Sequence, residues 1–509
     1  MSIPGPSESE QIKRLKRELE WAHLRIRSLE ERLRQQRIEK YGPKSEKLSD
    51  AQLELLEGEP GVSTDEVAAE SQREPLPTAA SAESDSKPGK VRRHPGRQQL
   101  PAHLPRVEQV IGCTADECVC QQCGKQKAVI GYEQSEQLDV EPARYFVVVT
   151  KREKRACADC VQGVSTAAVA ERIVEKGLVS DRVVVDTLVA KYSDHLPLYR
   201  QSVMLEREAG ISIGRATMDG WIMRCGELLV PVAAAIGREL LAGSYIQADE
   251  TPVPVQMHDG RGKNHQAYLW QYGRPGGSVV FDFRMGRGRE GPLKFLSKFE
   301  GVLQTDGYVA YERAGGPKVV HAACWAHARR KFFDAVKLNP EDRVAARMVA
   351  RIDELFAIDA EARNTAMDHA ARHGLRQERS RPVVDLLRSE IEGGKASALP
   401  SSALGKAFSY TLSLWRKLVR FLEYPEIELS NNLAENSMRP VVVGRKNWIH
   451  VGSEEAGPKV AAILSVVESC RRLGISLREY LASVLPGLAN LSIQRIHSCT
   501  PAAWASSRV

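Results

Sequence analysis

The chain has 509 residues, of which 42% are hydrophobic and 27% are charged, and its formal net charge is +7. This length predicts several domains, and the composition is that of an ordinary soluble protein. No apolar run of membrane-spanning length stands out and the first thirty residues are rich in charge, which argues against a membrane span and a signal peptide.

The N-terminal segment, residues 1–48, shows a heptad pattern. Its apolar residues recur in alternating steps of three and four, at Ile12, Leu15, Leu19, Ala22, Ile26, Leu29 and Leu33. This spacing predicts a coiled coil, and therefore a homo-oligomer. The alternative is an amphipathic helix that packs on its own chain. Gly42 and Pro43 end the pattern.

Residues 49–106 read as a flexible linker that ends in a basic arm. Residues 51–86 contain nine acids and one base and no aromatic residue, so they bury too little apolar surface to fold. Residues 87–106 contain six Lys or Arg and no acid. This basic arm is suited to contacts with a phosphate backbone, although a solvated basic linker fits equally well.

Residues 107–175 contain two close cysteine pairs, Cys120 with Cys123 and Cys157 with Cys160. Each pair has the CxxC spacing, and four converging thiolates match the tetrahedral shell of zinc. Residues 145–151, between the pairs, read as a β-strand. The pattern predicts a zinc ribbon with a structural Zn2+, because four protein ligands leave no open position. Unliganded buried thiols are the alternative, and Cys113 and Cys118 are left over.

Residues 176–242 are rich in helix formers. Residues 201–209 and 214–227 read as two helices around a turn at Gly210, with Arg215 near the start of the second. This order is that of a helix-turn-helix, whose second helix enters the major groove. A plain helical hairpin is the alternative reading.

Residues 243–457 carry the most informative acids. Residues 244–255 read as a strand that ends with Asp249 and Glu250, residues 267–272 and 278–283 as two further strands, and residues 301–305 as a strand that stops at Asp306. An acid at the end of an apolar strand is costly unless it is paired or binds a cation, although it can also cap a helix. Asp249 and Glu250 should point to opposite faces, so only one of them can join a shared site.

A third acid, Glu435, lies in a segment that reads as a short helix. Ser430 or Asn431 can cap this helix, and Pro440 is expected to end it. The cations and the aromatic residue that follow, in residues 444–448, are suited to contact with nucleic acid.

Several motifs in one order resemble the transposases of the insertion-sequence-sixty-six family. In the acidic half they are ADETP (248–252), LQTDGY (303–308), CWAHARRKF (324–332), NNLAE (431–435), RP (439–440) and GRKNW (444–448). In the first half they are YGPKSEK (41–47), HLPR (103–106), the two CxxC pairs and DHLPLYR (194–200). Residues 436–438 depart from the usual run of the family.

The resemblance implies a multidomain α/β protein with a ribonuclease H-like catalytic core, a helical insertion at about residues 339–424, and Asp249, Asp306 and Glu435 as the catalytic triad. It also implies DNA transposition, in which two Mg2+ or Mn2+ ions held by these carboxylates support cleavage of the transposon ends and strand transfer into target DNA. The alternatives are a zinc-ribbon and helix-turn-helix regulator without catalysis, and a nuclease without strand transfer.

DNA, both transposon ends and target, is therefore the expected partner, with accessory proteins of the same element as further candidates. The residues expected to contact DNA are Arg215, Arg329, Arg330, Lys331, Arg439, Arg445, Lys446 and Trp448. Residues 458–509 read as helices that pack on the catalytic core. We expect the protein in the cytoplasm, at the nucleoid, and not at a membrane.

Overall fold

The structure is a computed structural model that describes residues 145–156, 164–257 and 263–508, with single residues between 15 and 33 and at 122 and 125. The described residues between 15 and 33 are helical and their large apolar side chains are exposed. The coiled coil itself stays a prediction, and the linker and basic arm lie outside the described residues. The chain divides into two compact units, and all elements named below belong to the one that excludes Thr78–Thr150.

A mixed five-stranded sheet has the strand order β5-β4-β3-β6-β7. β3, β4 and β5 are antiparallel neighbours, whereas β6 and β7 run parallel to β3. β6 pairs only with residues Tyr245, Ile246 and Gln247 of β3, so the second half of β3 lies beside β4 without β6. The strands are β3(Tyr245–Val255), β4(His265–Gly273), β5(Val279–Arg284), β6(Val302–Thr305) and β7(Val320–Ala323).

The edge strand β5 is covered by α15(Ala456–Arg472). The backbone N–H groups of Val279 and Phe281 donate to Ser469 Oγ and Ser465 Oγ, each at 2.9 Å. Because these donors face away from β4, the two serines satisfy groups that an open sheet edge would leave for another chain. α15 is therefore part of the core of the sheet domain.

Three helices precede the sheet: α4(Asp181–Tyr192), α5(Leu198–Ala209) and α6(Arg215–Leu241). Gly210 has φ 68° at the end of α5, the left-handed conformation that makes glycine a common helix stop. The predicted helix-turn-helix order is present, but α6 continues to Leu241 rather than ending near residue 227. α6 also corrects the expectation that no apolar run reaches membrane-spanning length, although 61% of its most apolar window is buried in the protein.

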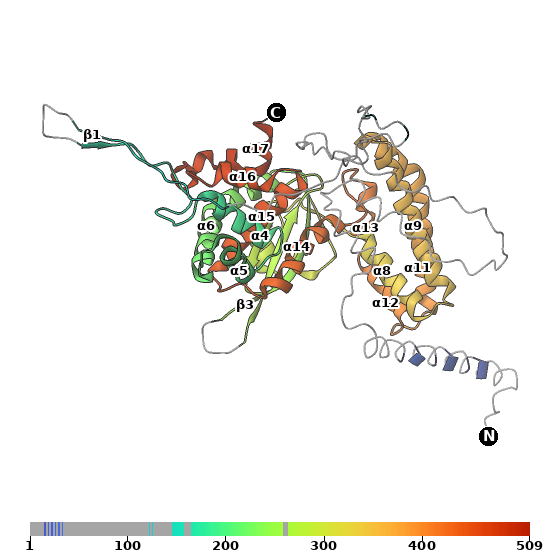
Figure 1. Cartoon of the computed structure of the whole chain (residues 1–509). Coiled ribbons are helices and arrows are strands. Elements are labelled where there is room, and N and C mark those ends of the chain that lie inside the picture. The colour runs from blue at the N-terminus through green and yellow to red at the C-terminus, as the bar shows by residue number, and fades with distance from the viewer. Residues whose placement is uncertain are drawn as a thin grey trace, which may run out of the picture. The chain divides into compact units, whose positions relative to one another are not determined.

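A second group of helices lies in the chain between β7 and α14(Asn432–Trp448), and Figure 1 shows them gathered into a bundle. They have their own hydrophobic core, which also contains Tyr245, Val302 and residues of β7. The group begins at Trp325, earlier than the predicted residue 339. Its members are α8(Trp325–Leu338), α9(Arg343–Asn364), α10(His369–Leu375), the π-helical turn η2(Arg376–Ser380), α11(Arg381–Ser397), α12(Ala403–Ser413), α13(Trp415–Leu418) and η3(Val419–Leu422).

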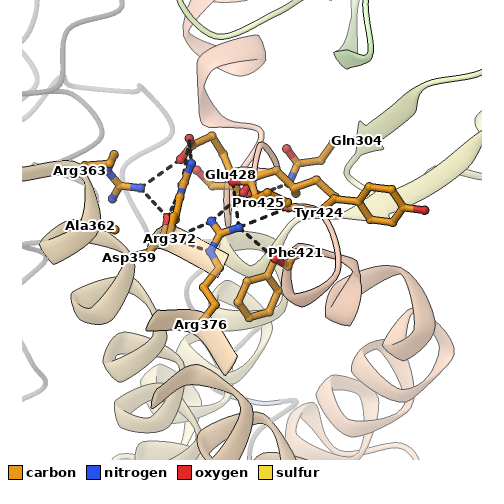
Figure 2. Close-up of polar contacts among 12 residues, drawn as sticks. Gln304, Asp359, Ala362, Arg363, Arg372, Arg376, Phe421, Tyr424, Pro425 and Glu428 are labelled. Atoms are coloured by element: carbon orange, nitrogen blue, oxygen red, sulfur yellow. Dashed lines mark hydrogen bonds and ion pairs between the residues drawn. The ribbon is translucent and has the colours of Figure 1, made fainter. Parts of the chain in front are cut away.

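A buried charge network fixes these helices to the segment that leads into α14. Figure 2 shows Asp359 of α9 surrounded by three arginines, Arg363, Arg372 and Arg376. Arg363 and Arg372 also pair with Glu428, at 3.0 and 3.1 Å. Burial would raise the pKa of Asp359, but the three guanidinium groups outweigh it and lower this pKa to about 2.

Three predicted features of the backbone are corrected. Residues 145–151, which the structure describes, form no strand, and their side chains are exposed. Among the described residues after them, β1(Lys154–Ala156) pairs with β2(Val164–Thr166). Asp249 and Glu250 lie in the middle of β3, since β4 pairs with this strand as far as Val255.

Pro440 lies inside α14 rather than ending it. A proline inside a helix costs about 3 kcal/mol, so other contacts must hold both halves of the helix. Arg472 donates to Leu433 O at 2.6 Å and to Ser437 Oγ in the first half. Arg445 donates to Thr251 Oγ1 of β3 at 3.1 Å in the second half.

The chain ends in short helices after α15: α16(Leu477–Val484), η4(Leu488–Asn490), η5(Ile493–Cys499) and α17(Pro501–Ser506). Tyr480 and Leu481 of α16 are buried in the same core as the sheet. The predicted packing of this segment on the core is confirmed.

Candidate active site

Asp249 lies at the centre of the sheet, on the face of β3 that it shares with Gln271 of β4. Burial raises the pKa of Asp249 well above its ordinary value, and the charges of Glu435, Glu250 and Asp306 raise it further. The side chain therefore lies within electrostatic range of its neighbour Glu250 and of Glu435 and Asp306, which come from distant parts of the chain.

Asp306 follows β6 directly, as the sequence predicts. Its Oδ1 accepts a hydrogen bond from the backbone N–H of Tyr308 at 2.8 Å. Gly307 has φ 93°, and a Cβ atom there would lie 2.7 Å from Leu414 Cδ1, so this turn requires glycine. On the other side, Tyr410 Oη of α12 donates to the Asp306 carbonyl at 2.8 Å.

Glu435 lies in the first turn of α14 and its side chain is 40% exposed. His327 Nε2 of α8 lies 3.6 Å from Glu435 Oε1. The segment before α14 is bound to the sheet, because Gln247 Nε2 donates to Ser430 O at 3.0 Å and Gln304 Nε2 donates to Glu428 O at 2.6 Å. Gln304 precedes Asp306 by two residues, so these hydrogen bonds connect the strand that leads to the second acid with the segment that leads to the third.

The charges of Asp306 and Glu435 thus both act on Asp249, the first of the three predicted catalytic acids. Among the described residues, however, no three His, Cys, Asp or Glu side chains lie close enough to hold one metal ion. Like charges repel, and carboxylates without a cation between them are expected to stand apart or to take up a proton. Mg2+ and Mn2+ prefer carboxylate oxygens as ligands, so the chemistry of these three acids fits either ion. Their side chains do not, however, surround a single position in the structure.

The register of the sheet separates the side chain of Asp249 from that of Glu250. Asp249 pairs with Gln271 and Glu250 with Trp270, so their side chains lie on opposite faces. Glu250 accepts hydrogen bonds from Arg287 and Tyr311. Both carboxylate oxygens of Glu250 are therefore bound to side chains of the protein.

The residues predicted to contact DNA fall into two groups. Five are exposed: Arg215, Arg330, Lys331, Arg439 and Lys446. Lys331 Nζ lies 5.7 Å from the centre of the Tyr410 ring, and Tyr410 donates to the backbone carbonyl of Asp306, so this cation lies near the Asp306 turn.

The other three are engaged within the protein. Arg329 is 5% exposed and its guanidinium pairs with Asp353 of α9. The prediction that Arg329 contacts DNA is therefore wrong, because this group is buried and its charge is neutralised. Arg445 bonds to β3. Trp448 is partly buried, packs on the sheet core and lines a small cavity with Lys191 and Tyr192.

Two residues near the site, Tyr410 and Arg287, were not predicted as site residues from the sequence. Tyr410 lies 104 residues after Asp306 in the chain, and no local pattern connects the two. Arg287 lies in a loop of arginines and glycines between β5 and α7(Glu290–Leu296), a pattern that could have marked it. The four predicted zinc ligands, Cys120, Cys123, Cys157 and Cys160, lie outside the described residues.

Three family models match the chain. The model described as "Transposase IS66 family" matches residues 176–459, which include Asp249, Asp306 and Glu435. The model described as "Transposase C of IS166 homeodomain" matches residues 28–108. The model described as "zinc-finger binding domain of transposase IS66" matches residues 117–161, which include all four predicted zinc ligands.

Similar proteins are found in Sinorhizobium fredii. "Uncharacterized protein y4qI" is 34% identical over 77% of this chain and 74% of its own length. "Uncharacterized protein y4hP" is 30% identical over 94% of this chain and 88% of its own length. "Uncharacterized protein y4jD" is 32% identical over 81% of this chain and 82% of its own length.

Proposed function

Because this chain belongs to the IS66 family of transposases, we propose that it cleaves transposon ends and joins them to target DNA with Asp249, Asp306 and Glu435 as its catalytic acids. The observation that supports this proposal most directly is the electrostatic interaction among the three carboxyl groups. Asp249 is half-buried, and the charges of Glu435 and Asp306 raise its pKa. Such a cluster is unfavourable by itself and becomes favourable when a cation is bound.

The arrangement of the sheet supports a ribonuclease H-like core. Such a core is expected to carry the first acid on its central strand, the second beside it and the third on a later helix. β3 is the central strand of five and carries Asp249, β6 is its neighbour and leads to Asp306, and α14 carries Glu435.

Bound Mg2+ or Mn2+ would activate a water or a DNA 3′-hydroxyl and stabilise the leaving oxygen. The chain's own residues position this chemistry. The sheet fixes Asp249, the Gly307 turn and Tyr410 fix Asp306, and the bonds from Gln247 and Gln304 fix the segment before Glu435. The exposed Lys331, beside Tyr410, is placed to contact a phosphate of the DNA backbone.

The remaining parts of the chain serve DNA binding and assembly in this proposal. The zinc-finger match over residues 117–161 supports one structural Zn2+ held by the two CxxC pairs. The exposed N-terminus of α6, with Arg215, is proposed to read the major groove. The exposed apolar positions between Leu15 and Leu33 are proposed to pair with a second copy of the chain.

The test is cleavage of DNA that carries the ends of the element, in the presence of Mg2+. Asp249→Ala, Asp306→Ala and Glu435→Ala should each reduce cutting by more than about 100-fold, because losing a metal ligand costs more than losing the partner of a ligand. DNA binding, measured by gel shift, should be nearly unchanged.

Glu312→Ala is the matched control, since Glu312 is an exposed acid six residues after Asp306 and should leave cutting unchanged. Wild-type cutting by any of the three variants would remove that residue from the site. Binding without any cutting by the wild type would favour a regulator, and cutting without a strand-transfer product would favour a nuclease.

A further inference from the structure

Glu250 is a fourth acid near the three proposed catalytic carboxylates, and its side chain is buried. Its side chain is 2% exposed and lies on the face of β3 opposite Asp249. Glu250 Oε1 accepts from Arg287 Nε at 3.1 Å and from Arg287 Nη2 at 2.7 Å. Glu250 Oε2 accepts from Tyr311 Oη at 2.9 Å. Both oxygens are therefore occupied by donors, one from the loop between β5 and α7 and the other from the turn that follows Asp306.

Arg287 is held on a second side by Tyr308. Its guanidinium carbon lies 4.2 Å from the centre of the Tyr308 ring, which is the stacking geometry of a cation–π contact. Tyr308 Oη also donates to the backbone carbonyl of Arg287, at 3.2 Å. A planar guanidinium can make the paired bonds to Glu250 and stack on the ring at the same time, which a lysine cannot do.

Tyr308 and Tyr311 belong to the turn that begins at Asp306. The Tyr308 N–H donates to Asp306 Oδ1 at 2.8 Å, and Tyr311 closes the short helix η1(Val309–Tyr311). Glu250 thus binds one end of this turn directly, through Tyr311. It binds the other end through Arg287 and Tyr308. The position of the second catalytic acid is tied in this way to the strand that carries the first.

We propose that Glu250 and Arg287 are positioning residues that hold the Asp306 turn in the conformation required for metal binding. This inference rests on the proposed function, because it assumes that Asp306 is a metal ligand. Arg287 has a second consequence in this arrangement: it occupies the Glu250 carboxylate, so that Glu250 does not compete for the metal with the three catalytic acids.

The sign of one substitution separates positioning from simple electrostatics. Arg287→Met removes a positive charge near the acids, so electrostatics by itself would make Mn2+ bind more tightly. Positioning predicts the opposite, because outer partners of metal ligands typically contribute 10- to 100-fold in affinity. We expect Arg287→Met to weaken Mn2+ binding by about 10-fold. Arg289→Met removes the same charge from an exposed position of the same loop and should not weaken it.

Mn2+ binding is measured on the full-length, DNA-free protein by electron paramagnetic resonance, with the melting temperature and the gel shift as controls for folding and DNA binding. Where Arg287→Met does not fold, Tyr308→Leu takes its place, because it removes the stacking ring and keeps the Glu250–Arg287 pair. Weaker Mn2+ binding at an unchanged gel shift supports the inference.

Unchanged or tighter Mn2+ binding in the folded variant overturns it. Asp306→Asn separates this failure from that of the proposed function. If Asp306→Asn weakens Mn2+ binding and Arg287→Met does not, the positioning role alone is wrong. If Asp306→Asn has no effect on Mn2+ binding, both the metal site and the positioning role are overturned.

Discussion

Removal of the Asp359 carboxylate should destabilise the helices between β7 and α14 more than any exposed ion pair of the same helices can. Asp359 is 1% exposed. It accepts five hydrogen bonds, one from Arg363, two from Arg372 and two from Arg376 (Figure 2). In Asp359→Ala, three arginines would face Glu428 as their one remaining acidic partner in this network.

The expected cost follows from burial. Breaking a buried ion pair by removing one partner costs about 3–5 kcal/mol, because the remaining charge is left uncompensated. For a domain of this size, each kcal/mol lowers the melting temperature by roughly 2–4 °C. We therefore expect Asp359→Ala to lower the melting temperature of this part of the chain by about 10 °C.

Glu361→Ala is the matched control. Glu361 lies two residues further along α9 and pairs with Arg379 of η2 at 2.6 Å, but the two side chains are 45% and 47% exposed. An exposed pair contributes at most about 1 kcal/mol. Scanning calorimetry of both full-length variants measures the difference. Equal melting temperatures for the two variants would refute the conclusion that burial makes the Asp359 network essential.

Three further predictions concern pH and packing. The pKa of Asp359 is lowered to about 2 against an ordinary value of 3.8, so its contribution is complete above pH 4 and is lost as the pH falls toward 2; an acid titration that is the same in wild type and Asp359→Asn would contradict this. The pKa of Asp249 is raised, so the unfolded chain ionises this side chain at a lower pH than the folded chain does. In Mg2+-free buffer at pH 7, Asp249→Asn should therefore melt at a higher temperature than the wild type. Below pH 3.8 this difference should disappear. Gly457→Ala should destabilise the protein by about 1–3 kcal/mol, because the new Cβ overlaps the Phe283 ring. Gly393→Ala, at an exposed position of α11 with open space around it, should stabilise the protein by about 0.5–1 kcal/mol. Urea unfolding that ranks the two variants in the opposite order would contradict the packing.

The helical region between the second and third acids shows why such a long gap is compatible with one site. The segment before α14 is bound on one side by Arg376, which donates to Phe421 O and Ile427 O at 2.9 and 2.8 Å. It is bound on the other side by Gln304 of β6. The inserted helices thus contribute a wall against which the start of α14 is placed, although they carry none of the three acids.

Much of the local structure could be predicted from the sequence. The apolar runs predict β4, β5 and β6, and Asp306 follows β6 as expected, because alternating or continuous apolar residues determine where strands form. Gly210 marks the turn between α5 and α6, because glycine accepts the left-handed conformation found there. The motif order identified the family, which the family matches confirm.

The contacts that decide which side chain does what could not be predicted in this way. The sequence predicts that Asp249 and Glu250 point to opposite faces of the strand but leaves open which of them joins a shared site. Only the tertiary structure shows that Glu250 pairs with Arg287, which lies 37 residues further along the chain. Arg329 reads as a phosphate-binding residue, yet it pairs with Asp353 of the next helix.

What the amino-acid sequence determined by itself is therefore the set of elements and the candidate acids, since both follow from short-range patterns and backbone preferences. The tertiary structure decided which acids lie within electrostatic range of one another and which contacts hold their segments there. Tyr410 reaches Asp306 across 104 residues and Gln247 reaches Ser430 across 183. Such contacts depend on how distant segments pack, and packing between segments leaves no pattern within either one.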